Sequence, residues 1–361
     1  MTLRVAYFLP ELETSGDRTQ VRLLQQGLPT DRYQTRLFGF VTDRSLQENA
    51  EQDEFRLCRP LSMDPFPLLK MAREIRSWKP DLLHTWRVAK LGIESWWPLK
   101  NIARWRVATV HNPASGPAPL IPGRATRWLA HCHRVTATSQ FMGRQLENDC
   151  LNTRLEVIPA AVERYDEEHA SSSFRETLGI PSSAPCIALL GSDAHQERFR
   201  DALEMMELLC AVNDNLHMVV LGRGAKAPWI GRFCRQLEID SRVHVPASGC
   251  WQQVLAEATL LLLPAQSRGT STSLLHALSA SLPLVLADTP ANRSIVDERC
   301  AEFFPAGDSG QCARQVHQLL KDPSRLASMA EAGQVFFESL NKVQQMVTGY
   351  DSLYQDLVAG G

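Results

Sequence analysis

Short apolar runs alternate with longer amphipathic segments along most of the chain. Leu260–Leu263 is a run of four leucines that ends at Pro264. It is too short for a helix and is typical of a buried parallel strand. After it, Leu274, Leu275 and Leu278 fall on one face of a helix, and Leu284–Ala287 forms a second apolar run. This order of strand, loop, helix and strand predicts one unit of an α/β sheet.

The same alternation continues on both sides of this unit. At 361 residues the chain favours two domains over one. We therefore expect an α/β protein with two doubly wound, Rossmann-like domains that face a cleft. The expected parts are a first domain at 1–163, a linker at 164–183, a second domain at 184–340 and a C-terminal helix at 341–361 that crosses back to the first domain. Further strands are expected at 3–9, 35–41, 81–86, 106–111, 134–139, 155–159, 186–191 and 216–221.

A polar loop precedes the helix that carries Leu274. Its hydroxyl groups are suited to capping a helix. The unpaired N–H groups and the dipole at a helix N-terminus favour an anionic ligand. In an open α/β sheet this edge is also where ligands bind, so the loop predicts a phosphate site. Its residues are Gly269, Thr270, Ser271, Thr272 and Ser273.

Two histidines stand at the ends of expected strands. His84 falls near the end of the strand at 81–86, and His111 ends the strand at 106–111. The carboxyl ends of parallel strands form the ligand edge of a sheet, which favours a functional role. Alternatively, either ring is a core imidazole that hydrogen bonds to backbone.

The segment from Pro264 to Val285 resembles the donor-binding segment of the family 4 retaining glycosyltransferases, which have GT-B architecture. Six residues stand where that pattern expects them: Pro264, Gly269, Ala277, Leu278, Pro283 and Val285. The two glutamates of the pattern are replaced by Arg268 and His276, and Ser281 replaces a glycine.

The resemblance extends over nearly the whole chain. Ser15 and Gly16 form a weakened copy of the Gly-Gly loop after the first strand, and Ser139 matches the serine that closes the first domain. Gly222 and Arg223 resemble the Gly-x-Gly loop of the second domain. Where the family has an arginine and a lysine for the donor diphosphate, this chain has Ser192 and Glu197, with Arg198 and Arg200 close by.

The resemblance implies transfer of a sugar from a nucleotide-sugar to a cell-envelope, polysaccharide or lipid-linked acceptor, with retention of anomeric configuration. His111 would steady the donor sugar, and no metal or other cofactor is required if arginines carry the diphosphate charge. The residues expected to bind the donor are Arg198, Gly222, Arg223, Arg268, Gly269, Thr270, Ser271, Thr272, Ser273 and His276. The residues expected on the acceptor side are Ser15, Gly16, His84 and Ser139.

The loss of both glutamates and of the arginine–lysine pair supports a second hypothesis. The chain would then be a catalytically silent relative that keeps the fold and serves as a binding or scaffold protein. Binding of nucleoside diphosphates discriminates between the two hypotheses.

Charge is distributed unevenly. The net charge is −2, yet residues 65–145 hold thirteen Lys/Arg against three acids and six of the eight tryptophans. Basic residues interleaved with Trp96, Trp97 and Trp105 in the span 96–106 predict peripheral contact with an anionic membrane or a phosphorylated acceptor. The alternative is a helix that buries its tryptophans and leaves its arginines in solvent.

Other features limit the compartment and the partners. Nine scattered cysteines without a Cys-x-x-Cys pair indicate reduced thiols, and no apolar run approaches membrane-spanning length. The N-terminal residues lack a signal-peptide core. We expect a cytoplasmic protein, peripheral at the inner face of the membrane, with no nucleic-acid-binding module. His131, Cys132 and His133 are adjacent and point in different directions, so they do not predict a metal site.

Overall fold

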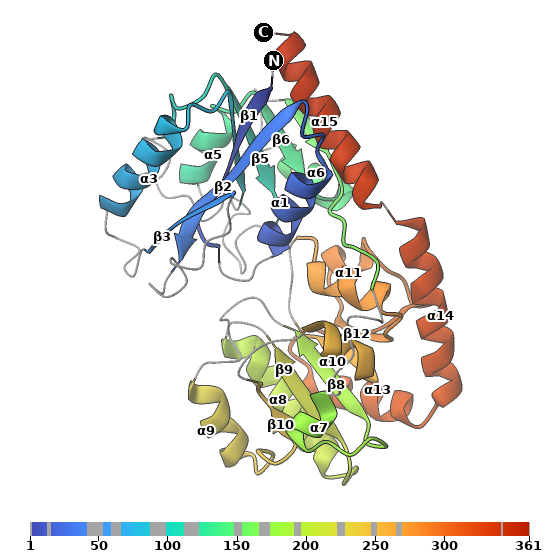
Figure 1. The fold of residues 1–361 in the computed structure, drawn as a ribbon. Helices are drawn as coiled ribbons and strands as arrows, with labels where there is room; N and C mark the ends of the chain where they lie inside the picture. Colours follow the sequence, from blue (N-terminus) through green and yellow to red (C-terminus); the bar gives the residue numbers. More distant parts are fainter. Residues whose placement is uncertain are drawn as a thin grey trace. The chain divides into compact units, whose positions relative to one another are not determined.

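A computed structural model describes most of the chain, which divides into two compact units (Figure 1). The first unit comprises Met1–Ala161, Arg268–Thr270 and Asn341–Gly361, and the second comprises Val162–Ser267 and Ser271–Leu340. The residues that the structure describes are 2–12, 16–41, 53–58, 66–86, 99–111, 123–147, 154–165, 174–190, 196–221, 228–246, 251–264, 269–340 and 342–360.

The first unit is built on a parallel sheet. Its described strands pair in the order β3-β2-β1-β4-β5-β6-β7. Val5 lies opposite Thr35 on one side and Leu82 on the other, so the first strand of the chain is central and the order reverses beside it. The strands are β1 Leu3–Leu9, β2 Tyr33–Val41, β3 Glu54–Cys58, β4 Leu82–Trp86, β5 Trp105–Val110, β6 Arg134–Ala137 and β7 Arg154–Val157.

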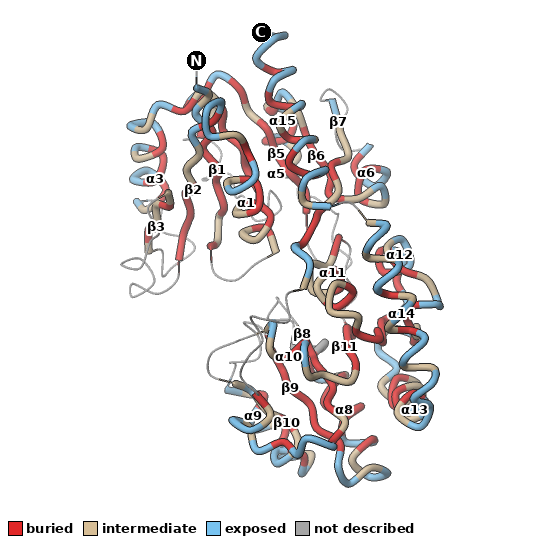
Figure 2. The backbone as a smooth tube through the Cα atoms, turned by 45° about the vertical axis from the view of Figure 1, so that its right-hand side comes forward, coloured by how far each residue is buried: buried red, intermediate tan, exposed pale blue. Residues whose placement is uncertain are grey.

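Helices cover both faces of this sheet (Figures 1 and 2). Alternate residues of each strand feed two separate cores: Val5, Tyr7 and Leu9 enter one, and Ala6 and Phe8 enter the other. The first core lies under α1 Gly16–Gly27 and α15 Val343–Ala359. The second lies under α3 Phe66–Ser77, α5 Gly123–Leu129 and α6 Gln140–Leu146.

The C-terminal helix α15 belongs to the first unit, as the sequence predicted. Its Tyr350 and Tyr354 are fully buried against the central strands. A Cβ atom added to Gly27 would lie 2.5 Å from Cγ2 of Val347. Only glycine therefore allows α1 and α15 to approach this closely at that point.

The second unit is built in the same way. Its described strands pair in parallel in the order β10-β9-β8-β11-β12-β13, with the reversal between β8 and β11. The strands are β8 Cys186–Leu190, β9 His217–Leu221, β10 Val243–His244, β11 Leu260–Leu263, β12 Leu284–Ala287 and β13 Ala301–Phe304. The helices are α7 Phe174–Leu178, α8 Gln196–Cys210, α9 Pro228–Gln236, α10 Trp251–Glu257, α11 Thr272–Ser279, α12 Pro290–Arg293, α13 Ser309–Leu320 and α14 Pro323–Ser339.

Two doubly wound, Rossmann-like units confirm the predicted fold class. The residues predicted as linker include α7, and its Phe174 packs in the core of the second unit. None of the helices in the described ranges is long and apolar enough to cross a membrane.

The tryptophan-rich span 96–106 is only partly described. Trp96 and Trp97 lie outside the described residues. Trp105 is in β5, a strand rather than the helix of the alternative interpretation, and only 8% of its surface is exposed. Its ring is therefore buried in the sheet and does not face a membrane.

Candidate functional site

An imidazole and a carboxylate meet at the carboxyl edge of the first sheet. His111 directly follows β5, and Asp17 is in the first turn of α1. Nδ1 of His111 lies 3.1 Å from Oδ1 of Asp17, and both side chains are almost completely buried. A carboxylate only accepts hydrogen bonds, so a neutral His111 places its proton on Nδ1 and leaves Nε2 as an acceptor.

Nε2 of His111 is buried and has no hydrogen-bond partner among the described residues. A buried polar atom without a partner is uncommon, because its desolvation is not compensated. The atom is therefore available to a ligand hydroxyl. The sequence predicted His111 but missed Asp17, which lies 94 residues away. The local signal for Asp17 was an acid in the first turn of a helix at the ligand edge.

His84 occupies a different environment from the one predicted. The strand β4 continues for two residues beyond it, so the ring lies inside the sheet instead of at its edge. Nδ1 is 2.6 Å from the Tyr354 hydroxyl, and Nε2 is 2.6 Å from Oγ1 of Thr109. Burial lowers the pKa of His84 from 6.5 to about 3. With both nitrogens engaged inside the core, His84 is a structural residue, and the predicted site role is corrected.

Ser139 and Gly16 both begin helices. Ser139 is the N-cap of α6, where its Oγ accepts a hydrogen bond from the Met142 N–H at 3.2 Å. This local structural role explains the serine without a ligand. Gly16 is the first residue of α1 and precedes Asp17. Ser15 lies outside the described residues.

The predicted phosphate loop leads into α11 of the second unit. Ser271 is the N-cap, and its Oγ accepts from the Leu274 N–H at 3.4 Å. Gly269 and Thr270 are buried, whereas Ser271, Thr272 and Ser273 are half-buried. The strand β11, fully buried, fixes the start of this loop at the carboxyl edge of its sheet. The first turn of α11 thus has the position expected of an anion-binding helix end.

His276 lies one turn further along α11. Burial lowers its pKa from 6.5 to about 4, so the ring is neutral at pH 7. The ring of Trp251 in α10 packs against it, with centroids 4.1 Å apart. A neutral imidazole can accept a hydrogen bond from a hydroxyl group, as the glutamate of the related pattern would. Nothing local in the sequence indicates Trp251, which contacts His276 from another helix.

Two family models match the chain, one in each half. Residues 14–164 match "Glycosyltransferase Family 4", and residues 171–336 match "Glycosyl transferases group 1". The two matches do not overlap and together span 317 of the 361 residues. The chain is a family 4-like glycosyltransferase. No curated protein matches its sequence.

Solved structures similar to this glycosyltransferase have the GT-B fold. Sucrose-phosphate synthase from Thermosynechococcus elongatus is 14% identical, with a TM-score of 0.79 over 99% of this chain and 100% of that one. HepE from Anabaena, in complex with UDP-glucose, is 14% identical, with a TM-score of 0.75 over 98% and 100%. The apo form of the lipopolysaccharide outer core galactosyltransferase WaaB is 12% identical, with a TM-score of 0.65 over 98% and 100%.

Several predicted donor residues of the glycosyltransferase cannot be placed. Gly222, Arg223 and Arg268 lie outside the described residues. Arg198 is in the first turn of α8, but the structure describes its backbone only. Their roles stay predictions from the resemblance.

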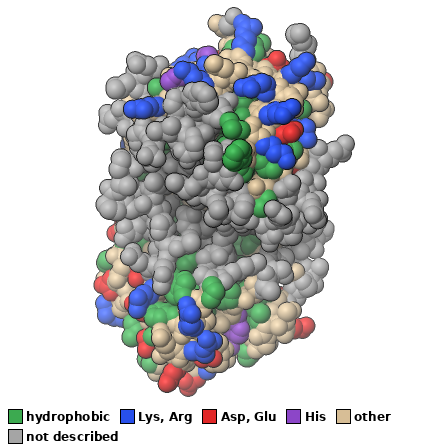
Figure 3. All heavy atoms as spheres, turned by 90° about the vertical axis from the view of Figure 1, so that its left-hand side faces the viewer, with side chains coloured by type: hydrophobic (Ala, Val, Ile, Leu, Met, Phe, Trp, Pro, Cys, Tyr) green, Lys and Arg blue, Asp and Glu red, His purple; other side chains and the backbone are tan. Residues whose placement is uncertain are grey.

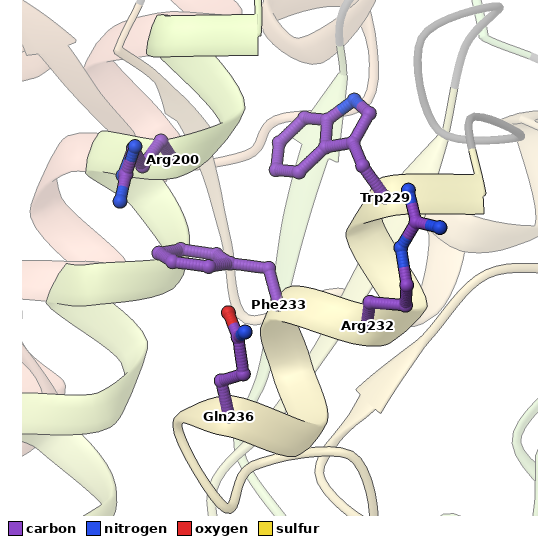
Figure 4. Close-up of a pocket in the computed structure, with 5 residues that line it drawn as sticks. All are labelled: Arg200, Trp229, Arg232, Phe233 and Gln236. Carbon is purple, nitrogen blue, oxygen red and sulfur yellow. The ribbon is translucent and has the colours of Figure 1, made fainter.

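A small cavity of about 220 Å³ lies between α8 and α9 (Figure 4). Its lining residues are Arg200, Trp229, Arg232, Phe233 and Gln236. Arg200 is engaged: its Nε lies 3.2 Å from Oε1 of Glu204, and its Cζ lies 4.8 Å from the centroid of the Phe233 ring. The volume is below the range of roughly 300–1,000 Å³ that is usual for ligand sites, so this cavity does not hold a nucleotide-sugar.

The adjacent His131, Cys132 and His133 bond to backbone. Nδ1 of His131 is 2.7 Å from the Arg127 carbonyl, Sγ of Cys132 donates to the Trp128 carbonyl, and Nδ1 of His133 accepts from the Arg106 N–H. Among the described residues, no group of three or more His, Cys, Asp or Glu side chains is arranged to hold a metal ion.

Proposed function

We propose that this glycosyltransferase transfers a sugar from a nucleotide-sugar donor to a cell-envelope, polysaccharide or lipid-linked acceptor, with retention of configuration. The observation that carries the proposal is the buried pair of His111 and Asp17. At the ligand edge of the first sheet, it leaves one imidazole nitrogen with no hydrogen-bond partner among the residues that the structure describes. A sugar hydroxyl is the kind of group that such a nitrogen binds.

The second unit carries the residues proposed to bind the donor. The first turn of α11 would bind the diphosphate through its N–H groups and hydroxyls. Arg268, with Arg198 and Arg223, would neutralise the charge of the leaving group, so that the reaction needs no metal. His276 would accept a hydrogen bond from a donor hydroxyl because its ring is neutral at pH 7.

The donor class is supported by solved structures of the same fold. HepE from Anabaena was solved in complex with UDP-glucose, and the pneumococcal O-GlcNAc transferase GtfA with UDP and GlcNAc. A uridine diphosphate sugar is therefore the first donor to test. In the proposed retaining reaction, the leaving phosphate takes the proton of the acceptor hydroxyl, and His111 holds the donor sugar during this step.

Turnover of nucleotide-sugars tests the proposal. The purified protein is incubated with a panel of nucleotide-sugars and lipid or oligosaccharide acceptors, and release of nucleoside diphosphate is measured. His111→Ala should lower kcat/KM roughly 10- to 100-fold, which corresponds to the loss of one hydrogen bond of about 1.5–3 kcal/mol in a shielded site.

His131→Ala is the matched control, because His131 precedes β6 and so lies at the opposite edge of the sheet from His111, where its Nδ1 bonds to the carbonyl of Arg127. It should leave turnover unchanged. If the unmodified protein neither turns over nor binds any nucleotide in calorimetric titration, the catalytically silent hypothesis is correct and the proposal is wrong.

A further inference from the structure

The outer face of α3 is both apolar and basic. Phe66 is 75% exposed and Leu69 is 52% exposed, values that are unusual for such large apolar side chains. The helix already buries a complete apolar stripe on its inner face, so these two residues are additional to the core (Figure 2). The inner stripe consists of Leu68, Met71, Ala72 and Ile75.

Three cations share the outer face with Phe66 and Leu69. At 100° per residue, Lys70, Arg73 and Arg76 fall within the same sector of about 120°. All three are exposed, and none has an ion-pair partner in the described part of the chain. Figure 3 shows hydrophobic side chains next to a group of lysines and arginines on this side of the molecule. We call Phe66, Leu69, Lys70, Arg73 and Arg76 the α3 surface.

Acidic residues do not oppose this charge on the helix. The only acid of α3 is Glu74, which lies at the flank of the sector and is half-buried. With Lys79, two residues after the helix, the segment 66–79 holds four basic residues and one acid, a net charge of +3. The positive charge thus attracts an anionic surface along the whole length of the helix.

The α3 surface also has a defined position relative to the site. The helix connects β3 to the parallel strand β4, so it runs antiparallel to the strands. Its first turn, with Phe66 and Leu69, therefore lies toward the carboxyl ends of the strands. His111 is at that same edge, at the end of β5.

We propose that the α3 surface binds an anionic lipid bilayer. Phe66 and Leu69 enter the interface between headgroups and acyl chains, and Lys70, Arg73 and Arg76 contact the lipid phosphates. This assigns the membrane contact to α3 in place of the span 96–106, in which the described tryptophan Trp105 is buried. Lipid binding of this kind does not require the transferase activity. It would bring the ligand edge of the first sheet toward the bilayer, where lipid-linked acceptors lie.

Vesicle flotation with the full chain tests the proposal. Vesicles contain either equal parts of phosphatidylglycerol and phosphatidylcholine or phosphatidylcholine alone, at low and at high salt. Binding should occur on the anionic vesicles at low salt and weaken strongly at high salt or on neutral vesicles, because the attraction is screened. Failure to float with anionic vesicles at low salt overturns the proposal.

Two sets of variants locate the contact. Arg73→Gln with Arg76→Gln should weaken the partition constant about 25-fold, since each basic residue near an anionic surface contributes roughly five-fold. Phe66→Ser with Leu69→Ser should reduce binding by a similar factor or more and should weaken the residual binding at high salt. The fold of each variant is checked by its circular dichroism spectrum and melting temperature.

The matched control changes exposed apolar residues of the second unit. Leu208 and Val212 are 48% and 61% exposed, so Leu208→Ser with Val212→Ser removes comparable apolar surface. Flotation should be unchanged. The proposal is wrong if the α3 variants float as well as the parent. It is equally wrong if the parent does not bind vesicles but forms a concentration-dependent dimer in light scattering, and Phe66→Ser with Leu69→Ser abolishes that dimer. A second copy of the chain would then cover this face.

Discussion

At the residue scale, the contact between His111 and Asp17 determines which kind of ligand group can hydrogen bond to the imidazole. Asp17 fixes a proton on Nδ1, so the opposite nitrogen is a hydrogen-bond acceptor and suits a hydroxyl more than a carbonyl. The carboxylate is buried in the first turn of α1, where the helix N-terminus stabilises its charge. If His111 binds the donor sugar as proposed, Asp17 is a positioning residue that acts through His111.

Replacing Asp17 tests this role. Asp17→Asn keeps the size of the side chain but allows the amide to donate to Nδ1, which moves the imidazole proton to Nε2. We expect kcat/KM to fall roughly 10-fold, in the range of one hydrogen bond. In the His111→Ala background the same change should have no further effect, because the ring on which it acts is gone. Additive losses in the double variant would show that Asp17 acts on the fold and not through His111.

His84 shows why the residue scale cannot be judged from a strand pattern alone. Both histidines follow apolar residues of predicted strands, and the pattern does not distinguish them. His84 is structural because Tyr354, 270 residues away, and Thr109 occupy its two nitrogens. Within the described part of the chain, one nitrogen of His111 has no hydrogen-bond partner. Contacts between distant residues make this difference, and a local pattern does not contain them.

At the element scale, strands with continuous apolar runs were predicted correctly, whereas β3 was missed. The leucine run of β11 and the central strand β1 have no other plausible structure. The strand β3 contains Glu54 and Arg56, whose charges indicate a solvated loop. Tertiary ion pairs replace that solvation: Oε2 of Glu54 accepts from Arg18, Arg22 and Arg56 at 3.2, 2.8 and 2.8 Å.

The candidate site was predicted in part for the same reason. The helix-end loop at 269–273 and the position of His111 follow from strand ends, which are local in sequence. Asp17 and Trp251 come from other elements, so only the fold brings them to His111 and His276. The family resemblance added the donor roles of residues such as Arg268, but it does not supply distances.

Glu54 is expected to stabilise the connection between α1 and β3. Its side chain is fully buried, so Glu54→Ala leaves three guanidinium groups near each other without their shared acceptor. Loss of one partner from a buried ion pair costs about 3–5 kcal/mol, and we expect the free energy of unfolding in urea to fall by roughly 3 kcal/mol.

Asp53 provides the control for this measurement. It also pairs with Arg22, at 3.0 Å, but 42% of its side chain is exposed. Asp53→Ala should therefore cost less than about 1 kcal/mol. Equal losses for the two variants would contradict the role given to burial.

At the scale of the whole molecule, buried titrating groups limit stability at both ends of the pH range. Burial lowers the pKa of His84, His276, His217 and His244, so the fold holds these rings neutral. Burial raises the pKa of Tyr350 to about 12, and those of Tyr7 and Tyr354 also rise. We expect highest stability between these two sets of titrations, near neutral pH.

The acid side gives a quantitative expectation. In the unfolded chain a histidine takes up a proton near pH 6.5, whereas in the folded protein His84 does so only near pH 3. Below pH 6.5 the unfolded state therefore binds more protons, and the free energy of unfolding falls as the pH is lowered. For His84 alone this loss is about 2 kcal/mol between pH 7 and pH 5, and it continues until the folded pKa near 3 is reached.

Melting temperatures and urea unfolding at pH 7, 6 and 5 measure this dependence, with His84→Gln compared with the parent. Glutamine keeps hydrogen-bonding groups near Tyr354 and Thr109 but does not titrate, so the variant should lose less stability between pH 7 and pH 5 than the parent, by about 2 kcal/mol. His317→Gln on α13, where the side chain is partly exposed, is the control. It should lose as much free energy of unfolding between pH 7 and pH 5 as the parent does. If His84→Gln leaves the pH dependence of the free energy of unfolding unchanged, protonation of the buried imidazole is not coupled to unfolding.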